Sequence, residues 1–356
     1  MAHSVIPTIQ VTSKEESQQL MVVWPDIIRD IKEAIENFDV PDIAKWIEKV
    51  LQYNVPHGKK NRGLGLIYAY KLLEPNDQLT EENIRLARIL AWCVELTQAY
   101  FLIMDDIEDQ SLFRRGQPCW YRYNDLGLAA VNDCFMIQGS VFYLIRKHFK
   151  GKDCYVNLLE TFQDVTMKAA MGQSLDLHFS NFGRKPNLDL FTTNQYNSII
   201  EFKTAYCTTY LPVILAMHLA GIKDQDMFKE ATTILTEIGC FFQIQDDYLD
   251  CYGDFEVCGK DNTDIQEGKC TWFIVEALQR VTPQQRKILE ECYGDLDREK
   301  VQRVKQLFND LNLLDAYFGY EKETHNLINV HIMQMSSGLP HNLFFDILKK
   351  YYHRVS

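Results

Sequence analysis

The sequence lacks the features that mark several large classes of protein. Its ten cysteines form no CxxC pair and no regular framework, so we expect reduced thiols that are mostly buried in a core. No run of lysines and arginines offers a patch for a membrane surface, and a formal net charge of −12 argues against nucleic acid as a partner. No apolar run approaches the roughly 18 to 20 residues that a membrane span requires.

The N-terminal segment also lacks a recognisable targeting signal. It has neither the cationic and apolar parts of a secretory signal peptide nor the arginine-rich, acid-poor composition of a transit peptide. We therefore expect a cytoplasmic protein.

The chain shows no alternation of strand and helix patterns, no low-complexity tract and no linker that would divide it. Apolar residues recur instead with the 3.6-residue period of helices, and 46% of the 356 residues are hydrophobic, which is enough for a large core. We expect one all-α domain over residues 1–356, with residues 1–12 as a flexible tail. Long helices joined by short breaks predict a single large helical bundle with its active site in a central cavity.

Proline, glycine and polar breaks set the ends of the expected helices. Thr80 is expected to cap the N-terminus of a long helix that ends near Asp105. The loop over residues 252–262, rich in glycine and aspartate, is a candidate lid. The other helices are expected over residues 14–38, 41–52, 64–73, 125–149, 153–178, 192–220, 226–251, 263–280, 297–317, 320–336 and 341–353.

Two acidic runs of the same pattern dominate the chain. The first acidic motif is Asp105-Asp106-Ile107-Glu108-Asp109, and the second acidic motif is Asp246-Asp247-Tyr248-Leu249-Asp250. Each follows apolar residues at helical spacing, so its aspartates share one face near the end of a buried helix. Like charges there repel unless a cation lies between them, and Mg²⁺ is usually held by a few carboxylates together with substrate phosphates. The pair of motifs predicts a metal site, whereas either motif alone would be read as a solvated helix end.

Six segments between residues 53 and 272 resemble, in order, the signature blocks of the trans-isoprenyl diphosphate synthase family. They are YNVPHGKKNRGL, DDIEDQSLFRRGQPCW, GQSLDL, FKTAY, FFQIQDDYLD and GKDNTDIQEGKCTW. The resemblance implies the isoprenyl synthase fold and a homodimer. It also implies a Mg²⁺-dependent prenyltransferase that joins isopentenyl diphosphate head to tail to dimethylallyl and geranyl diphosphate, giving farnesyl diphosphate.

The resemblance implies that about three Mg²⁺ ions, for which Mn²⁺ can substitute, clamp the allylic diphosphate and stabilise it as a leaving group. The implied metal ligands are Asp105, Asp109, Asp246 and Asp250, with Asp106 and Asp247 assisting mainly through metal-bound water. The residues implied to contact or lie near the same diphosphate are Arg114, Lys203, Lys260, Lys269, Gln173 and Asp176.

The condensation also needs a second substrate, isopentenyl diphosphate, whose diphosphate must be bound without leaving. Such a site needs cationic side chains and no metal. The resemblance assigns this isopentenyl site to Gly58, Lys59, Arg62, Gln98 and Arg115, with Arg354 as the candidate that closes it. Arg114 and Arg115 are neighbours in sequence, so their side chains should diverge and serve one diphosphate each. Thr204, the Lys203 carbonyl and Gln243 match polar positions that face the carbocation between the two sites.

Product length depends on what lies beneath the first acidic motif. Tyr100 and Phe101 precede Asp105 by about one helical turn, roughly 5 to 6 Å, on nearly the same face. Two bulky aromatics at these positions resemble the short-chain members and imply a C15 product, with C10 as the alternative. His57 departs from the family pattern at the isopentenyl site. Cys207 and Thr209 replace positions that are often aromatic in the family, Tyr100 replaces a frequent phenylalanine, and Cys207 is also a chain-length residue. We expect a wider allylic cavity that accepts homologous substrates.

Three other readings remain open on the sequence alone. A geranyl diphosphate synthase would share every motif. A terpene synthase on the same scaffold would ionise one diphosphate and would not need Lys59, Arg62, Gln98 and Arg115. A non-catalytic partner subunit that regulates a true synthase would not need two complete acidic motifs.

Overall fold

The computed structural model describes residues 13–253 and 263–352. Lys260, Arg354 and the expected tail over residues 1–12 lie outside this range. The helices of the N-terminal half are α1 (Lys14–Glu36), α2 (Pro41–Asn54), α3 (Asn61–Leu73), α4 (Glu81–Glu108), α5 (Ala130–Phe149) and α6 (Tyr155–Phe179). Those that follow are α7 (Thr193–Ile199), the π-helix η6 (Ile200–Tyr210), α8 (Leu211–Leu219), α9 (Gln225–Tyr252), α11 (Asp264–Glu267), α12 (Trp272–Arg280), α13 (Pro283–Cys292), α14 (Arg298–Asp310), α15 (Leu313–Gln334) and α16 (His341–Tyr351).

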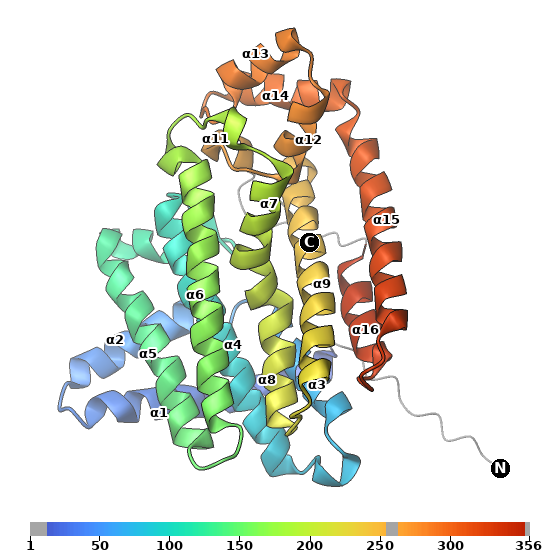
Figure 1. Ribbon diagram of the computed structural model, residues 1–356. Coiled ribbons are helices and arrows are strands. Elements are labelled where there is room, and N and C mark those ends of the chain that lie inside the picture. Colours follow the sequence, from blue (N-terminus) through green and yellow to red (C-terminus); the bar gives the residue numbers. More distant parts are fainter. Residues whose placement is uncertain (1–12, 254–262, 353–356) are drawn as a thin grey trace.

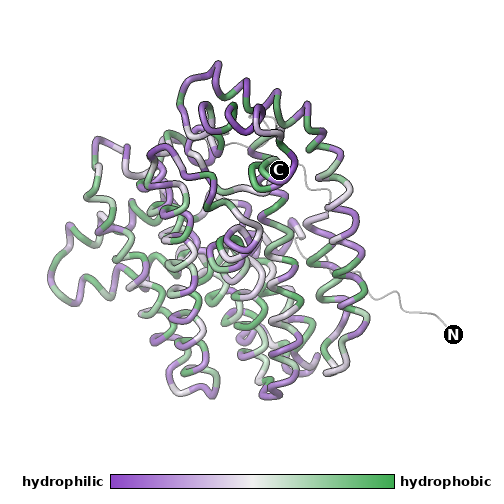
Figure 2. Tube along the Cα trace, turned by 45° about the horizontal axis from the view of Figure 1, so that its top comes forward, coloured by the Kyte–Doolittle hydropathy of each residue, from purple (hydrophilic) through white to green (hydrophobic). Residues whose placement is uncertain are grey.

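The protein is all-α, as expected from the sequence. Figure 1 shows α6, the run from α7 to α8, and α9 standing side by side, with α15 and α16 along one flank and α12 to α14 at one end. The strands found in the described residues are β1 (Phe113–Arg114) and β2 (Gln117–Pro118), which pair antiparallel in a short hairpin after α4. Figure 2 shows hydrophobic and hydrophilic residues alternating along the outer helices, which is typical of amphipathic helices that cover a core.

The buried apolar residues form two clusters, and three helices change from one cluster to the other. On α9, Phe241 belongs to the larger cluster and Ile244 to the smaller one. The run from α7 to α8 changes between Ile200 and Cys207, and α6 changes on passing from Val165 to Phe179. The polar residues between these points, among them Asp176, Lys203, Thr204 and Gln243, therefore lie where the two apolar clusters meet.

Most expected helices agree with the structure to within a few residues, and Thr80 caps α4 by accepting a hydrogen bond from Asn83 N at 3.2 Å. The differences have local causes. The helix expected over 192–220 contains the π-helical stretch, which a 3.6-residue pattern does not distinguish. Gly268, with φ of 68°, divides the helix expected over 263–280, and Asn312, with φ of 54°, separates α14 from α15. The short β hairpin and α13 were missed.

Two glycines let η6 pack between its neighbours. A Cβ built on Gly172 of α6 would lie 2.1 Å from Lys203 N, and one built on Gly239 of α9 would lie 2.5 Å from Ala205 Cα. Both distances are well inside van der Waals contact, so only glycine fits at either position. The backbone around Lys203 and Thr204 is therefore held between two helices at unusually short range.

Two segments are long and apolar enough to span a membrane by length and composition, which corrects the expectation of no such run. One is α4, whose most apolar stretch is 78% buried within the bundle, and the other is Gly127–Phe149, 44% buried. Many residues of α4, among them Leu90 and Trp92, belong to the larger buried apolar cluster.

Candidate active site

The first acidic motif, near the end of α4, faces two lysines from other elements. Lys203 Nζ on η6 lies 3.0 Å from Asp105 Oδ1 and 2.6 Å from Asp176 Oδ2. Lys269 Nζ, which follows α11, lies 2.5 Å from Asp109 Oδ1 and 2.9 Å from Asp176 Oδ2. Three carboxylates and two ammonium groups thus form one network, contributed by α4, α6, η6 and the segment before α12.

This network separates the pKa values of two neighbouring carboxyls. Burial raises the pKa of Asp105, but the charges of Lys203 and Lys269 outweigh burial and hold that pKa well below its usual range. At Asp109, burial together with repulsion from Asp105 raises the pKa to about 7. Asp105 is therefore the fixed anion of the pair at neutral pH.

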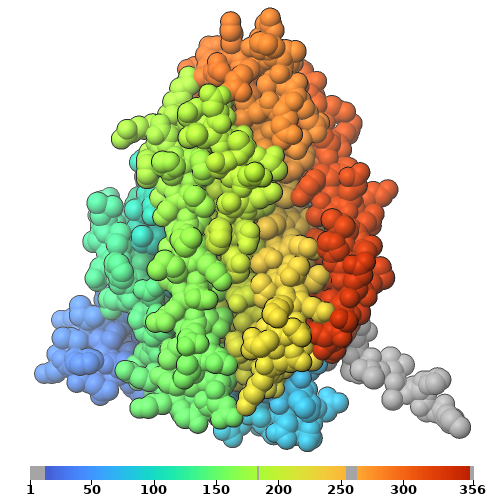
Figure 3. Space-filling model, in the orientation of Figure 1, coloured from blue at the N-terminus to red at the C-terminus, as the bar shows by residue number. Residues whose placement is uncertain are grey.

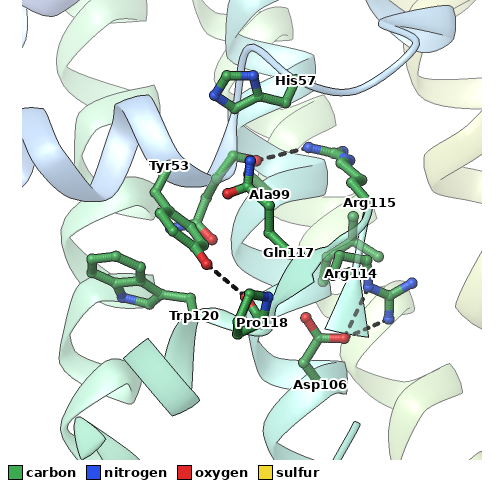
Figure 4. Close-up of a pocket in the computed structure, with 11 residues that line it drawn as sticks. Tyr53, His57, Ala99, Asp106, Arg114, Arg115, Gln117, Pro118 and Trp120 are labelled. Carbon is green, nitrogen blue, oxygen red and sulfur yellow. Dashed lines mark hydrogen bonds and ion pairs between the residues drawn. The ribbon is translucent and has the colours of Figure 1, made fainter. Parts of the chain in front are cut away.

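Asp106 turns away from the two lysines. Arg114 donates to Asp106 Oδ1 from Nε at 2.9 Å and from Nη2 at 2.5 Å (Figure 4). Because Asp106 is buried and both donors reach one oxygen, the carboxylate fixes the direction of the Arg114 guanidinium. The expected contact of Asp106 with metal-bound water stays a prediction.

In the second acidic motif, Asp247 turns into the protein interior. Its Oδ2 accepts hydrogen bonds from Tyr196 Oη at 2.6 Å and Trp272 N at 2.8 Å, and its Oδ1 accepts from Gln243 Nε2 at 2.9 Å. Burial raises the pKa of Asp247 to about 7, and the three donors act against this rise. Its expected role at metal-bound water also stays a prediction, because the structure shows it bound by protein donors.

The two remaining aspartates of the second motif differ in exposure. Asp250 is buried and accepts a hydrogen bond from Asp264 N at 3.1 Å, which ties α9 to α11. Asp246 is half-buried on the same helix.

Two pairs of residues link the two acidic motifs, one directly and one through Gln243. On η6, Lys203 binds the first motif, and the next residue, Thr204, donates to Gln243 Oε1 at 2.6 Å, one turn before the second motif. Lys269 likewise binds the first motif through its side chain, and Trp272 binds the second through its backbone N–H. The two motifs therefore belong to one polar region at the junction of the two apolar clusters, not to separate outer surfaces.

Arg114 and Arg115 point in different directions, as expected (Figure 4). Arg115 has φ of 56°, and its Nη1 donates to Asn54 O at 2.9 Å. Its guanidinium lies so close to Gly58 that a Cβ there would be 2.7 Å from Nη2. His57 lies beside them at the edge of the same pocket. Arg114 thus binds the first acidic motif, and Arg115 contacts the loop before α3.

Two of the other candidate residues of the isopentenyl site, Arg62 and Gln98, contact η6. Arg62 Nη2 donates to Thr208 Oγ1 at 2.8 Å, and Gln98 Oε1 lies 3.6 Å from Cys207 Sγ. Arg62 Nε is buried and has no hydrogen-bond partner within the described ranges. Lys59, in the loop before α3, is exposed. Arg62 therefore keeps a donor for a bound anion.

The aromatic pair beneath the first motif is present. Tyr100 and Phe101 contact each other with ring centroids 4.5 Å apart, and Tyr100 Oη lies 3.0 Å from Thr166 Oγ1 on α6. Thr209 does not join them, because its hydroxyl donates to Leu235 O on α9 at 2.6 Å. Of the two substitutions expected to widen the cavity, only Cys207 lies beside α4.

Sequence reasoning missed three residues of this region. Glu108 lies inside the first motif and accepts a hydrogen bond from Gln173 Nε2 at 2.7 Å, so its position was a usable signal. Thr208 follows Cys207 directly and carries no signal of its own. Tyr196 lies outside every signature block, and only the folded structure brings it to Asp247.

The fold and the site define an all-α enzyme that gathers carboxylates and cations in one polar region. A family model described as Polyprenyl synthetase matches residues 44–311, and the chain belongs to this family. The curated relatives it resembles are farnesyl pyrophosphate synthases. That of Nezara viridula is 48% identical over 97% of this chain and 84% of its own length, and that of Gallus gallus is 41% identical over 97% and 94%.

Solved structures agree with this assignment. A T. brucei farnesyl diphosphate synthase complexed with risedronate matches with a TM-score of 0.88 and 28% sequence identity. The match covers 95% of this chain and 99% of that one. The same helical architecture thus extends over almost the whole chain.

Proposed function

We propose that this chain is a farnesyl diphosphate synthase that adds isopentenyl diphosphate to dimethylallyl and then to geranyl diphosphate. The observation that carries this proposal is one polar region flanked by two different sets of cations. One set, Lys203, Lys269 and Arg114, is already paired with carboxylates. The other, Arg62 and Arg115, makes its hydrogen bonds to neutral oxygens of Thr208 and the backbone.

The first set suits a diphosphate that binds together with a divalent metal, which the family requires. We propose that this metal is Mg²⁺, with about three ions per site, because the candidate ligands are hard carboxylate oxygens. Asp105, Asp109, Asp246 and Asp250 would hold the ions. Within residues 13–253 and 263–352, no three acidic, histidine or cysteine side chains gather closely enough to hold a metal by themselves. Substrate phosphate would complete the coordination, as is usual for Mg²⁺.

Bound Mg²⁺ supplies the positive charge that stabilises a departing diphosphate. The residues of the chain then have separate tasks. Lys203 and Lys269 add ammonium donors on the allylic side, and Arg62 and Arg115 hold the isopentenyl diphosphate without metal. Thr204 lies between the two sides and presents its hydroxyl oxygen to the developing carbocation.

The alternatives are less well supported by the same contacts. A terpene synthase has no use for the second set of cations, which donate to neutral oxygens, and a regulatory subunit has no use for the paired network around Asp105. A C10 product is disfavoured as well, because the relatives are farnesyl pyrophosphate synthases and Tyr100 and Phe101 resemble the chain-length pair of short-chain members.

Product analysis tests the proposal directly. The purified chain is incubated with Mg²⁺, labelled isopentenyl diphosphate and either dimethylallyl or geranyl diphosphate, and the products are sized by chromatography. Farnesyl diphosphate from both allylic partners is expected. A product made from the allylic substrate alone would favour the terpene synthase. Ethyl-substituted allylic substrates in the same assay test whether Cys207 widens the cavity.

Thr208→Val should weaken the binding of isopentenyl diphosphate specifically. Loss of its hydrogen bond frees Arg62, so we expect KM for isopentenyl diphosphate to rise about tenfold while KM for geranyl diphosphate changes little. Steady-state kinetics with each substrate varied in turn measures this. Thr233→Val, which removes an exposed hydroxyl on α9, is the control. An equal rise in both KM values would show that Thr208 does not act through Arg62.

We propose that the protein is a cytoplasmic homodimer formed through α5 and α6. These helices expose large apolar side chains, among them Phe135, 67% exposed, and Met167, 64% exposed. In Figure 3 the face of α6 lies open over most of its length. The exposed apolar side chains from Leu128 to Phe182 are Leu128, Phe135, Val156, Met167, Met171 and Phe182.

Charged substitutions on this face should give monomers. We expect the chain to sediment as a dimer and Phe135→Glu combined with Met167→Glu to sediment as a monomer, since burying two carboxylates in an apolar interface is costly. Val330→Glu on α15, at another exposed apolar side chain, is the matched control and should leave the dimer intact. A dimer that survives the double substitution would place the interface elsewhere.

A further inference from the structure

A chain of four hydrogen-bonding groups runs from α7 to the π-helix, through α9, and three of the four residues, Tyr196, Asp247 and Thr204, are buried. Tyr196 Oη donates to Asp247, Gln243 Nε2 donates to the other oxygen of Asp247, and Gln243 Oε1 accepts from Thr204 Oγ1. The three distances are 2.6, 2.9 and 2.6 Å. Only Thr204, at the end of this chain, adjoins the lysine-carboxylate network through its neighbour Lys203.

The chemistry of the groups fixes the direction of every bond in this chain. The backbone N–H of Trp272 can only donate, so Asp247 acts as an acceptor here, and Gln243 turns its NH₂ group toward the other oxygen of Asp247. The amide oxygen of Gln243 then faces Thr204, which must donate its hydroxyl proton. The lone pairs of the Thr204 oxygen therefore face the group that binds beside it, and the Thr204 hydroxyl proton points away from that group.

Tyr196 is one of the three groups that donate to Asp247 and hold it in place. It is 2% exposed, it lies on a different helix from Gln243, and its hydroxyl shares Asp247 Oδ2 with the backbone N–H of Trp272. A carboxylate buried beside an apolar cluster needs such donors to remain charged and oriented. Without the phenol hydroxyl, the Asp247 carboxylate can rotate. The Gln243 amide then has a weaker preference for the orientation in which its NH₂ group faces Asp247.

We propose that Tyr196 is a positioning residue that acts through Asp247 and Gln243 to aim the Thr204 oxygen at the substrate carbocation. The proposal rests on the proposed function, since it needs a carbocation beside Thr204. It gives Asp247 a task in orienting Gln243, distinct from metal binding. This chain of hydrogen bonds stabilises the carbocation by fixing an oxygen lone pair of Thr204 before the reaction. Its loss should therefore lower kcat and leave substrate binding unchanged.

The test is a double-mutant cycle between the two ends of the chain. Tyr196→Phe keeps the ring and removes the hydroxyl, and Thr204→Val removes the oxygen at the other end. In mildly alkaline buffer with Mg²⁺, isopentenyl and geranyl diphosphates, Tyr196→Phe should lower kcat about tenfold and leave both KM values within about twofold. In the Thr204→Val background the same substitution should have almost no further effect.

Tyr317→Phe is the matched control, because Tyr317 is equally buried and its hydroxyl donates to another carboxylate, Glu321, at 3.3 Å. It should leave kcat unchanged. Gln243→Met breaks the chain in the middle and should show the same coupling to Thr204→Val if Tyr196→Phe does not fold. Wild-type kcat in Tyr196→Phe, or multiplicative losses in the double variants, would overturn the proposal. A wild-type chain that forms no farnesyl diphosphate would instead overturn the proposed function.

Discussion

Asp105→Ala is expected to lower kcat by about 10³-fold or more, because it removes the fixed anion of the first acidic motif and a metal ligand of the proposed site. Asp105 contacts Lys203 at 3.0 Å and Gln173 at 3.3 Å. Its loss should not unfold the protein, because Lys203 keeps its 2.6 Å contact with Asp176. Turnover of geranyl and isopentenyl diphosphates, together with thermal unfolding, measures both effects. Asp246→Ala in the second motif should lower turnover to a similar extent.

Asp164→Ala provides the matched control for this experiment. Asp164 also lies on a helix and faces a lysine, Lys168 at 3.9 Å, but its side chain is 73% exposed. We expect wild-type turnover from this variant. Near-wild-type turnover in Asp105→Ala, with the metal still required, would contradict the assignment of Asp105 as a ligand.

Gly172→Ala is expected to destabilise the fold strongly and to displace the catalytic region of η6. The added methyl group would lie 2.1 Å from Lys203 N and 2.5 Å from Lys203 Cα, and both are backbone atoms that cannot move independently. Overpacking of this kind costs about 3 kcal/mol or more. Any folded protein should show lower turnover, because Lys203 and Thr204 would shift together. Denaturant unfolding and steady-state kinetics report the two effects.

Gly319→Ala is the control, and its effect should have the opposite sign. Gly319 is exposed in the middle of α15, and a Cβ there meets nothing within 4 Å. Alanine is favoured over glycine within helices, so this variant should be more stable by about 0.5 to 1 kcal/mol. Equal stability changes in the two variants would show that α6 and η6 are not packed as closely as described.

Much of the fold followed from local pattern. The 3.6-residue periodicity predicted most of the long helices, and Thr80 correctly marked the start of α4 because its cap is a contact between near neighbours. The π-helix was missed for a physical reason. Its wider turn arises where η6 is confined between Gly172 of α6 and Gly239 of α9, which are far apart in sequence.

The candidate site divides in the same way. Asp105 and Asp109 share a face of α4 because of helical spacing, so their convergence on one region could be predicted. The partners of Asp106 and Asp247 could not, since a carboxylate one position along a helix turns by about 100° and meets whatever packs there. Arg114 meets Asp106, and Tyr196 meets Asp247.

By itself, the sequence determined the residue types that this chemistry needs, the helices that carry them and the family to which the chain belongs. Only the tertiary structure decided which of these residues touch. Lys203 and Lys269 reach the same Asp176, and Lys203 and Thr204 link the two acidic motifs, through contacts between segments at least 27 residues apart. Such contacts are set by how whole helices pack, and spacing within one helix carries no information about them.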